Sequence, residues 1–291
     1  MRIPFVKMHG CGNDFILIDE TRTSVMSKRL RRRFARQACD RHRSIGADGA
    51  IFLAMIRKKS AALAARFFMP DGSESEMCGN GARCVAAYAV YSGIAPMGKE
   101  IAIATMRRII RALVSRRRRN IFKVQVSLGS PRLGPGEIPI GAQGGTFIGR
   151  RISVPNVGAV QMTAVDTGVP HAIIFADDIE HIDVEEVGRA VRHMRTIFPH
   201  GTNVDFVEFN GLLRVRTYER GVERETLSCG TGIAAAAVAA YLAGRTSANR
   251  PIEVMTKGGR LTATIVVKDG LLKTVLLTGP AEIAFRGEVE F

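Results

Sequence analysis

Two alanine-rich apolar segments stand out in the hydrophobic pattern of the chain, and each predicts a buried helix. They span residues 80–91 and 231–243, and each follows a Cys-Gly-x-Gly motif. Gly93 and Gly244 close the two segments at the same offset from their cysteines. Alanine favours helix, and a glycine just past the last apolar position is a common helix stop. We therefore expect two similar helices with a cysteine at each N-terminus.

The other apolar segments are shorter and mostly predict strands. Residues 27–41 are an exception, since Leu30, Phe34 and Ala38 lie four apart among basic residues and predict an amphipathic helix. Residues 184–194 also have helical periodicity. Strands are expected at 3–8, 16–18, 50–56, 64–69, within 100–128, at 159–166, 172–175, 204–209 and 212–218, and in alternation up to residue 285.

The two halves of the chain repeat one order of elements. Each has strands, a turn with an asparagine before an apolar strand, and then a Cys-Gly-x-Gly helix. This repetition predicts an α+β fold of two pseudo-symmetric domains that meet at a cleft. The Gly- and Pro-rich stretch 129–149 contains the best boundary. We expect domains at 1–130 and 131–279, with residues 280–291 returning to the first.

Composition narrows the class of protein. The chain has 291 residues, 46% hydrophobic and 24% charged, as in an ordinary soluble globular protein. No apolar run approaches the roughly 18 residues of a membrane span. The five cysteines have no disulfide or zinc spacing. We therefore expect free thiols in a reducing cytoplasm and no metal.

The net charge of +15 raises the question of a polyanion partner. The excess lies partly in residues 28–36, on the predicted basic helix, and in Arg116–Arg119, where a hairpin tip is expected. No zinc-finger, RNA-recognition or helix-turn-helix pattern accompanies them. We interpret both runs as solvated surface, and keep polyanion binding as the alternative.

The two cysteines at the predicted helix starts indicate a specific chemistry. The first N–H groups of a helix lack partners, and the macrodipole is positive there, so the thiol pKa of Cys78 and Cys229 should fall. The glycines let free N–H groups approach a carboxylate. Two such frames suggest two thiols facing each other across one bound carboxylate. Cys11, Cys39 and Cys84 lack this frame and are interpreted as packing residues.

Four motifs, in order along nearly the whole chain, resemble diaminopimelate epimerase. They are residues 9–15 (HGCGNDF), 71–84 (DGSESEMCGNGARC), 201–204 (GTNV) and 218–232 (YERGVERETLSCGTG). The resemblance implies two similar domains, each a curved, mostly antiparallel sheet wrapped around a central helix. It also implies interconversion of LL- and meso-2,6-diaminopimelate, on the route to lysine and peptidoglycan, with neither metal nor pyridoxal cofactor.

The resemblance assigns roles to particular residues. Cys78 and Cys229 would be the base and the acid on opposite faces of the α-carbon, exchanging roles with direction. His171 would be an auxiliary group in proton handling. The substrate-binding set would be Asn13, Gly79, Asn80, Asn203, Glu219, Arg220, Gly230 and Thr231, in which Arg220 suits a carboxylate grip.

Two positions depart from the family pattern. Met69 and Val169 stand where many members have asparagines associated with the far end of diaminopimelate. A two-thiol racemase for another amino acid is therefore the nearest alternative. A cysteine-nucleophile transferase or hydrolase would leave the second motif unexplained, and a polyanion-binding protein would use the arginine runs. We expect a cytoplasmic homodimer acting on a small amino acid, with no membrane or nucleic-acid partner.

Overall fold

The computed structural model describes residues 1–22, 26–58, 61–76, 78–134, 137–138 and 146–291. The chain forms two compact units: Met1–Ser127 with Thr278–Phe291, and Leu128–Leu277. These divisions lie within a few residues of the expected ones. Among the described residues, no helix combines the length and apolar character needed to cross a membrane.

Unit 1 is a sheet that closes on itself around one helix. Its pairings run from β17 through β1, β2, β3, β4, β6, β7 and β8, and β8 pairs with β17 again. Among the strand pairs of this unit for which the register is known, β2–β3 and β4–β6 are parallel and the others are antiparallel. The elements are β1 (Arg2–Gly10), β2 (Asn13–Asp19), α1 (Lys28–Ala38), β3 (Gly49–Lys58), β4 (Ala61–Phe68), β5 (Glu74–Ser75), α2 (Gly79–Tyr91), β6 (Glu100–Ala104), β7 (Ile109–Arg118), β8 (Ile121–Ser127) and part of β17 (Leu271–Glu290).

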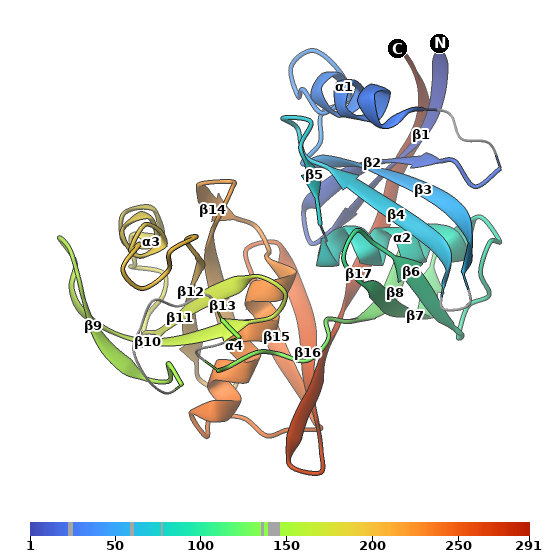
Figure 1. Cartoon of the computed structure of the whole chain (residues 1–291). Helices are drawn as coiled ribbons and strands as arrows, with labels where there is room; N and C mark the ends of the chain where they lie inside the picture. The colour runs from blue at the N-terminus through green and yellow to red at the C-terminus, as the bar shows by residue number, and fades with distance from the viewer. Residues whose placement is uncertain (23–25, 59–60, 77, 135–136, 139–145) are drawn as a thin grey trace. The chain divides into compact units, whose positions relative to one another are not determined.

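The small residues of α2 explain its central position. From Gly79 to Ala89 every residue is buried, and strands surround the helix (Figure 1). A helix that is apolar on all sides is stable only when it is covered on all sides. Gly93 ends this segment in the left-handed region, with a φ of 76°. The other helix, α1, packs Phe34, Ala35 and Ala38 against the outer face of the sheet.

Unit 2 repeats this connectivity. The parallel pairs β11–β12 and β13–β15 correspond to β2–β3 and β4–β6, and α4 corresponds to α2. The elements are β9 (Arg150–Val154), β10 (Gly158–Asp166), β11 (Pro170–Phe175), α3 (Val184–Arg192), β12 (Asn203–Phe209), β13 (Leu213–Glu219), β14 (Arg224–Thr226), α4 (Gly230–Leu242), β15 (Pro251–Thr256), β16 (Gly259–Lys268) and the first part of β17. The predicted α+β fold of two similar halves is confirmed.

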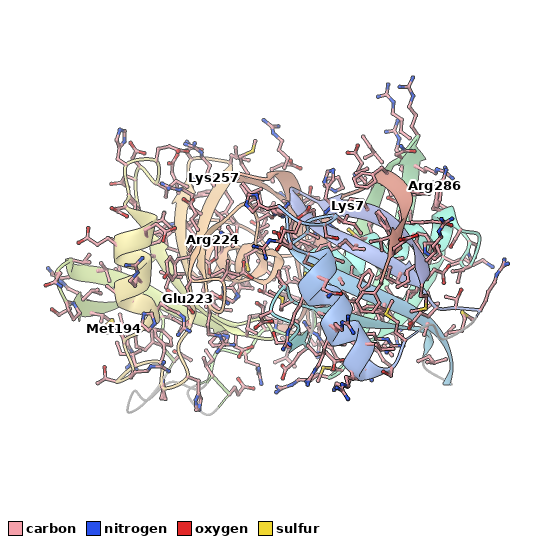
Figure 2. All side chains as sticks on the ribbon, turned by 90° about the horizontal axis from the view of Figure 1, so that it is seen from above. Lys7, Met194, Glu223, Arg224, Lys257 and Arg286 are labelled. Carbon is pink, nitrogen blue, oxygen red and sulfur yellow. The ribbon has the colours of Figure 1, made fainter. Side chains whose placement is uncertain are left out.

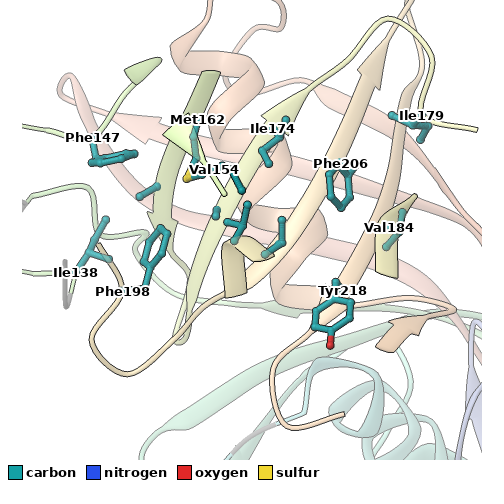
Figure 3. Packing of buried hydrophobic residues seen from close by; sticks show 14 residues of the cluster. Ile138, Phe147, Val154, Met162, Ile174, Ile179, Val184, Phe198, Phe206 and Tyr218 are labelled. Carbon is teal, nitrogen blue, oxygen red and sulfur yellow. The ribbon is translucent and has the colours of Figure 1, made fainter. Parts of the chain in front are cut away.

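The outer face of the second sheet is covered by α3. Phe206 and Tyr218 project from β12 and β13 into a cluster that includes Val184 of α3 and Phe198 (Figure 3). The opposite face packs against α4, whose residues from Gly232 to Ala240 are buried. In each unit the central helix therefore packs against the surrounding strands. This packing positions the start of the helix, where Cys78 or Cys229 lies.

The second arginine run lies at the tip of the β7–β8 hairpin, as predicted. β7 extends to Arg118, and the turn consists of Arg119, with a φ of 55°, and Asn120. Arg117 stacks on Tyr91 and Phe122, at 5.1 and 5.3 Å from the ring centroids. Side chains that end in nitrogen atoms project outward from this hairpin and from α1 (Figure 2). None of the ion pairs between described residues includes Arg116–Arg119, which agrees with a solvated basic surface.

Candidate active site

In unit 1 the start of α2 brings three predicted site residues together. Cys78 is the N-cap, and its sulfur accepts the Gly81 N–H at 3.4 Å. Its thiol faces Asn13 Oδ1 at 3.8 Å, and Asn80 Nδ2 donates to the same oxygen at 3.2 Å. The predicted placement of Cys78 at a helix N-terminus is therefore confirmed. Cys78 remains partly exposed, and Asn80 is buried.

A carboxylate network orients Asn13. Its Nδ2 donates to Asp48 Oδ2 at 2.9 Å, and Arg41 Nη2 donates to both Asp48 and Asp14. Lys7 Nζ lies 2.7 Å from Asp14 Oδ2. Asn13 therefore bonds to groups distant in sequence, rather than only capping its own turn. The network holds the amide oxygen of Asn13 toward α2.

This network predicts a pH-dependent stability. Burial alone raises the pKa of Asp14, but hydrogen bonds from Arg41 and Lys7 outweigh it and lower the pKa to about 2. A depressed carboxyl pKa stabilises the fold above the unfolded value near pH 4, and this stability is lost as the pH falls toward 2. We expect Asp14→Asn to lower the free energy of unfolding by about 2 kcal/mol at pH 7.

Urea unfolding of wild type and Asp14→Asn at pH 7 and at pH 2 to 4 tests this. The difference should shrink as the pH approaches 2. A difference that does not change with pH would show that the Asp14 charge contributes nothing. Asp40→Asn is a control, because the Asp40 carboxylate accepts the nearby backbone N–H groups of His42 and Arg43 rather than a charged side chain of the network.

A buried arginine lies next to the turn between β1 and β2. Arg83 of α2 is fully buried; its Nε donates to Pro280 O at 3.3 Å, and its Nη2 lies 3.9 Å from Cys11 Sγ. Its Nη1 has no hydrogen-bond partner among the described residues. Burial lowers the pKa of Arg83. Arg83 was not among the predicted site residues, although a lone charge within an alanine-rich helix was a visible signal.

The remaining cysteines of unit 1 behave as packing residues. Cys11, Cys39 and Cys84 are buried. Burial raises the pKa of the Cys39 and Cys84 thiols to about 12, and it raises that of Cys11 despite the opposing charge of Arg83. These thiols are therefore poor nucleophiles at neutral pH.

In unit 2, Cys229 has the equivalent place at the start of α4, but its electrostatics differ from expectation. It is the N-cap, is buried, and lies 3.4 Å from Thr231 Oγ1. Burial raises the thiol pKa of Cys229 well above its usual value, and Glu219 and Asp205 raise it further. The expected fall in pKa is therefore wrong for Cys229, because burial and two carboxylates outweigh the Thr231 hydroxyl and the Gly232 N–H.

The buried His171 of β11 connects this helix start to β12. Its Nδ1 lies 2.6 Å from Asp205 Oδ2, and its Nε2 lies 3.0 Å from Thr231 Oγ1 and 3.3 Å from Asn203 Nδ2. Asp205 Oδ1 accepts the Thr217 hydroxyl at 2.7 Å. Both His171 and Asp205 are fully buried. Asp205 was not predicted, although an acidic residue inside an apolar strand was a signal.

The other predicted binding residues of unit 2 lie near the adjoining ends of β12 and β13. Asn203 Oδ1 accepts the Arg220 backbone N–H at 2.7 Å. The Arg220 guanidinium donates to the carbonyls of His200 and Gly201, each at 3.3 Å. Glu219 Oε2 accepts the Thr226 hydroxyl. The structure therefore groups these residues, while the carboxylate grip of Arg220 stays a prediction.

The two departures from the family pattern both lie in turns. The Met69 backbone N–H donates to the Ser73 carbonyl at 2.8 Å, in the turn between β4 and β5. Val169 O accepts the Thr167 N–H at 3.3 Å, in the turn before β11. Both side chains are partly exposed. Each turn lies within its own unit, Met69 before Cys78 and Val169 before His171.

Solved structures with the same fold include a racemase and an epimerase. The chain matches a probable proline racemase from Agrobacterium radiobacter K84 with a TM-score of 0.72 at 15% identity, covering 99% of this chain and 93% of that one. It matches a hydroxyproline epimerase from Agrobacterium vitis with a TM-score of 0.71 at 15% identity, covering 99% and 92%. At this identity the likeness establishes the fold alone.

Sequence relatives establish the family. The family model for diaminopimelate epimerase matches residues 5–133 and 163–284. The diaminopimelate epimerase of Methanothrix thermoacetophila is 43% identical over 289 residues, covering 99% of this chain and 96% of the relative. That of Methanocella arvoryzae is 43% identical over 291 residues, covering 99% and 97%. The chain belongs to the diaminopimelate epimerase family, whose members are isomerases.

Proposed function

We propose that the chain interconverts LL- and meso-2,6-diaminopimelate without a cofactor, with Cys78 and Cys229 as the two-base pair. The observation that carries this proposal is the duplicated frame, in which each cysteine is the N-cap of the central helix of its unit. Membership of the epimerase family supports the reaction and its place in lysine biosynthesis. A transferase or hydrolase with a single catalytic thiol would leave the second Cys-Gly-x-Gly motif, at residues 229–232, unexplained.

The chemistry requires one proton to leave the α-carbon on one face and another to arrive on the other. A thiolate takes the first and a thiol supplies the second, and the reverse reaction exchanges their roles. Charge from the broken C–H bond passes into the α-carboxylate. The N–H groups at the starts of α2 and α4 are suited to stabilise that charge. They belong to Gly79, Asn80, Gly230 and Thr231.

The remaining polar groups would select the rest of the substrate. In this proposal Asn13, Asn203, Glu219 and Arg220 bind the backbone and the distal end of the substrate, with Arg220 on the distal carboxylate. Arg220 would exchange its carbonyl partners for a carboxylate, which pairs more strongly with a guanidinium. A cytoplasmic location is supported by the five free cysteines, since the mechanism needs reduced thiols. A homodimer stays a prediction that sedimentation velocity can test.

α-Proton exchange tests the reaction and the substrate together. The protein is incubated with LL-diaminopimelate in heavy water under reducing conditions, and deuterium uptake and meso product are followed by mass spectrometry and chiral chromatography. We expect both to appear together, and neither to appear with lysine. Exchange with a different amino acid would show that Met69 and Val169 have changed the specificity. No exchange with any amino acid would overturn the two-thiol reaction.

A further inference from the structure

Arg192, the last residue of α3, is a buried arginine that contacts two turns of unit 2. Its Nε and Nη2 donate to Glu223 Oε1 at 3.2 and 2.9 Å, and Glu223 lies beside α3 (Figure 2). Its Nη1 faces Gly201, where a Cβ would lie only 1.7 Å from that nitrogen. Because glycine has no Cβ, it leaves room for the guanidinium. Arg192 therefore joins the turn before β12 to the turn after β13.

The Glu223 side chain holds the second of these turns together. The carboxylate oxygen that binds Arg192 also accepts the Gly221 backbone N–H at 2.9 Å. The Glu223 N–H donates to the Glu219 carbonyl at 2.8 Å. Burial alone raises the pKa of Glu223, but the Gly221 N–H and Arg192 outweigh it and lower the pKa. Glu223 is therefore a carboxylate at neutral pH and forms an ion pair with Arg192.

The backbone of Glu223 adopts a conformation that glutamate disfavours. Its φ is 59°, in the left-handed region, where a residue with a Cβ is strained and glycine or asparagine is more common. The bonds from the carboxylate to Arg192 and Gly221 offset this strain. The conformation of the turn therefore depends on the Glu223 side chain.

The same two turns hold Arg220. Its guanidinium donates to the carbonyls of His200 and Gly201 in the first turn, each at 3.3 Å. Its backbone N–H lies in the second turn and donates to Asn203 Oδ1 at 2.7 Å. The direction of the Arg220 side chain therefore depends on how the two turns are placed, and Arg192 connects them.

We propose that Arg192 and Glu223, here called the clamp, position Arg220 for the distal carboxylate of the substrate. This inference rests on the proposed function, in which Arg220 binds that carboxylate. Arg192 and Glu223 are positioning residues, because both act through Arg220. A guanidinium that is already held in place loses less conformational freedom on binding, so the clamp should raise affinity for a substrate with a second carboxylate.

Glu223→Asn breaks the clamp without straining the backbone. Asparagine tolerates the left-handed region, but its side chain is shorter by one methylene group and carries no charge. We expect the KM for diaminopimelate to rise about tenfold. The kcat should change less than about threefold, because the lost contact lies away from the reacting carbon. Glu180→Asn is the matched control, because this exposed glutamate accepts a hydrogen bond from Arg214 in the same unit.

Labelling of Arg220 by phenylglyoxal, followed by peptide mass spectrometry, tests the clamp without turnover. When the turns are no longer joined, the guanidinium should leave its carbonyl partners more often, and Arg220 should react about fivefold faster in Glu223→Asn. Glu223→Gln keeps an acceptor for Gly221 and Arg192 but loses the charge. Its KM and its labelling rate should lie between those of wild type and Glu223→Asn.

Gly201→Ala tests the clamp from the other turn. A Cβ at Gly201 would displace the Arg192 guanidinium, so this variant should also raise the KM and speed Arg220 labelling. Gly244→Ala is the control for backbone strain, because Gly244 has a similar positive φ of 69° and a Cβ there would have no atom within 4 Å. It should leave the KM and the labelling rate unchanged.

Two results would overturn the clamp. One is a KM and an Arg220 labelling rate in Glu223→Asn that match those of Glu180→Asn. The other is a loss of kcat in Glu223→Asn with no change in either quantity. If wild type does not exchange the α-proton of diaminopimelate, the proposed function fails, while the labelling rates still decide whether the clamp positions Arg220.

Discussion

Cys78→Ala and Cys229→Ala should each reduce epimerisation of LL-diaminopimelate by at least about 10³-fold. Each substitution removes the group that gives or takes a proton on one face of the α-carbon. Because the second group cannot complete the inversion alone, the double variant should lose little more than either single variant. Initial rates of meso product formation in heavy water give the measurement, with circular dichroism to verify the fold.

Cys84→Ala and Cys39→Ala are the matched controls. Both thiols are buried and have a pKa of about 12, so neither supplies a thiolate at neutral pH. Losing a small buried side chain should lower stability slightly and leave turnover within a few-fold of wild type. Near-normal turnover in Cys78→Ala or Cys229→Ala would contradict the two-base mechanism.

The elements that local patterns encode could be predicted from the sequence. The Ala-rich segments form α2 and α4 because small apolar residues favour helix and tolerate burial on every side. Gly93 and Gly244 end these segments with positive φ, as expected for residues without a Cβ. The second arginine run lies at the predicted hairpin tip, where strand pairing continues to Arg118 and leaves a short turn.

The electrostatics of the site depend on contacts between distant residues, which local patterns do not contain. The raised pKa of Cys229 depends on burial and on carboxylates from β12 and β13. The link from Asp205 to His171 requires the parallel pairing of β11 with β12, which places His171 opposite Asn203. A helix N-terminus alone therefore predicted a lowered pKa for Cys229, whereas burial and contacts between distant residues raise it.

Gly232→Ala should reduce turnover about 100-fold, because a displacement of about 1 Å in a supporting group is enough for such a loss. A Cβ at Gly232 would lie 2.3 Å from Asp205 Oδ1 and 3.2 Å from Thr217 Oγ1. Asp205 is fully buried between His171 and Thr217, so it cannot move without breaking a hydrogen bond. Overpacking should also lower the free energy of unfolding by about 1–3 kcal/mol.

Gly244→Ala at the other end of α4 separates stability from catalysis. Gly244 has a φ of 69°, and a Cβ at this position would have no atom within 4 Å, so alanine there costs about 1 kcal/mol of backbone strain without touching Asp205. Both variants should unfold at lower urea concentration, but only Gly232→Ala should lose turnover. Equal losses of turnover would mean that stability alone limits activity.

Gly81 is the equivalent of Gly232 in unit 1. A Cβ at Gly81 would lie 2.7 Å from the ring of Phe67. The second glycine of each Cys-Gly-x-Gly motif, Gly81 or Gly232, is thus required for close packing behind its cysteine.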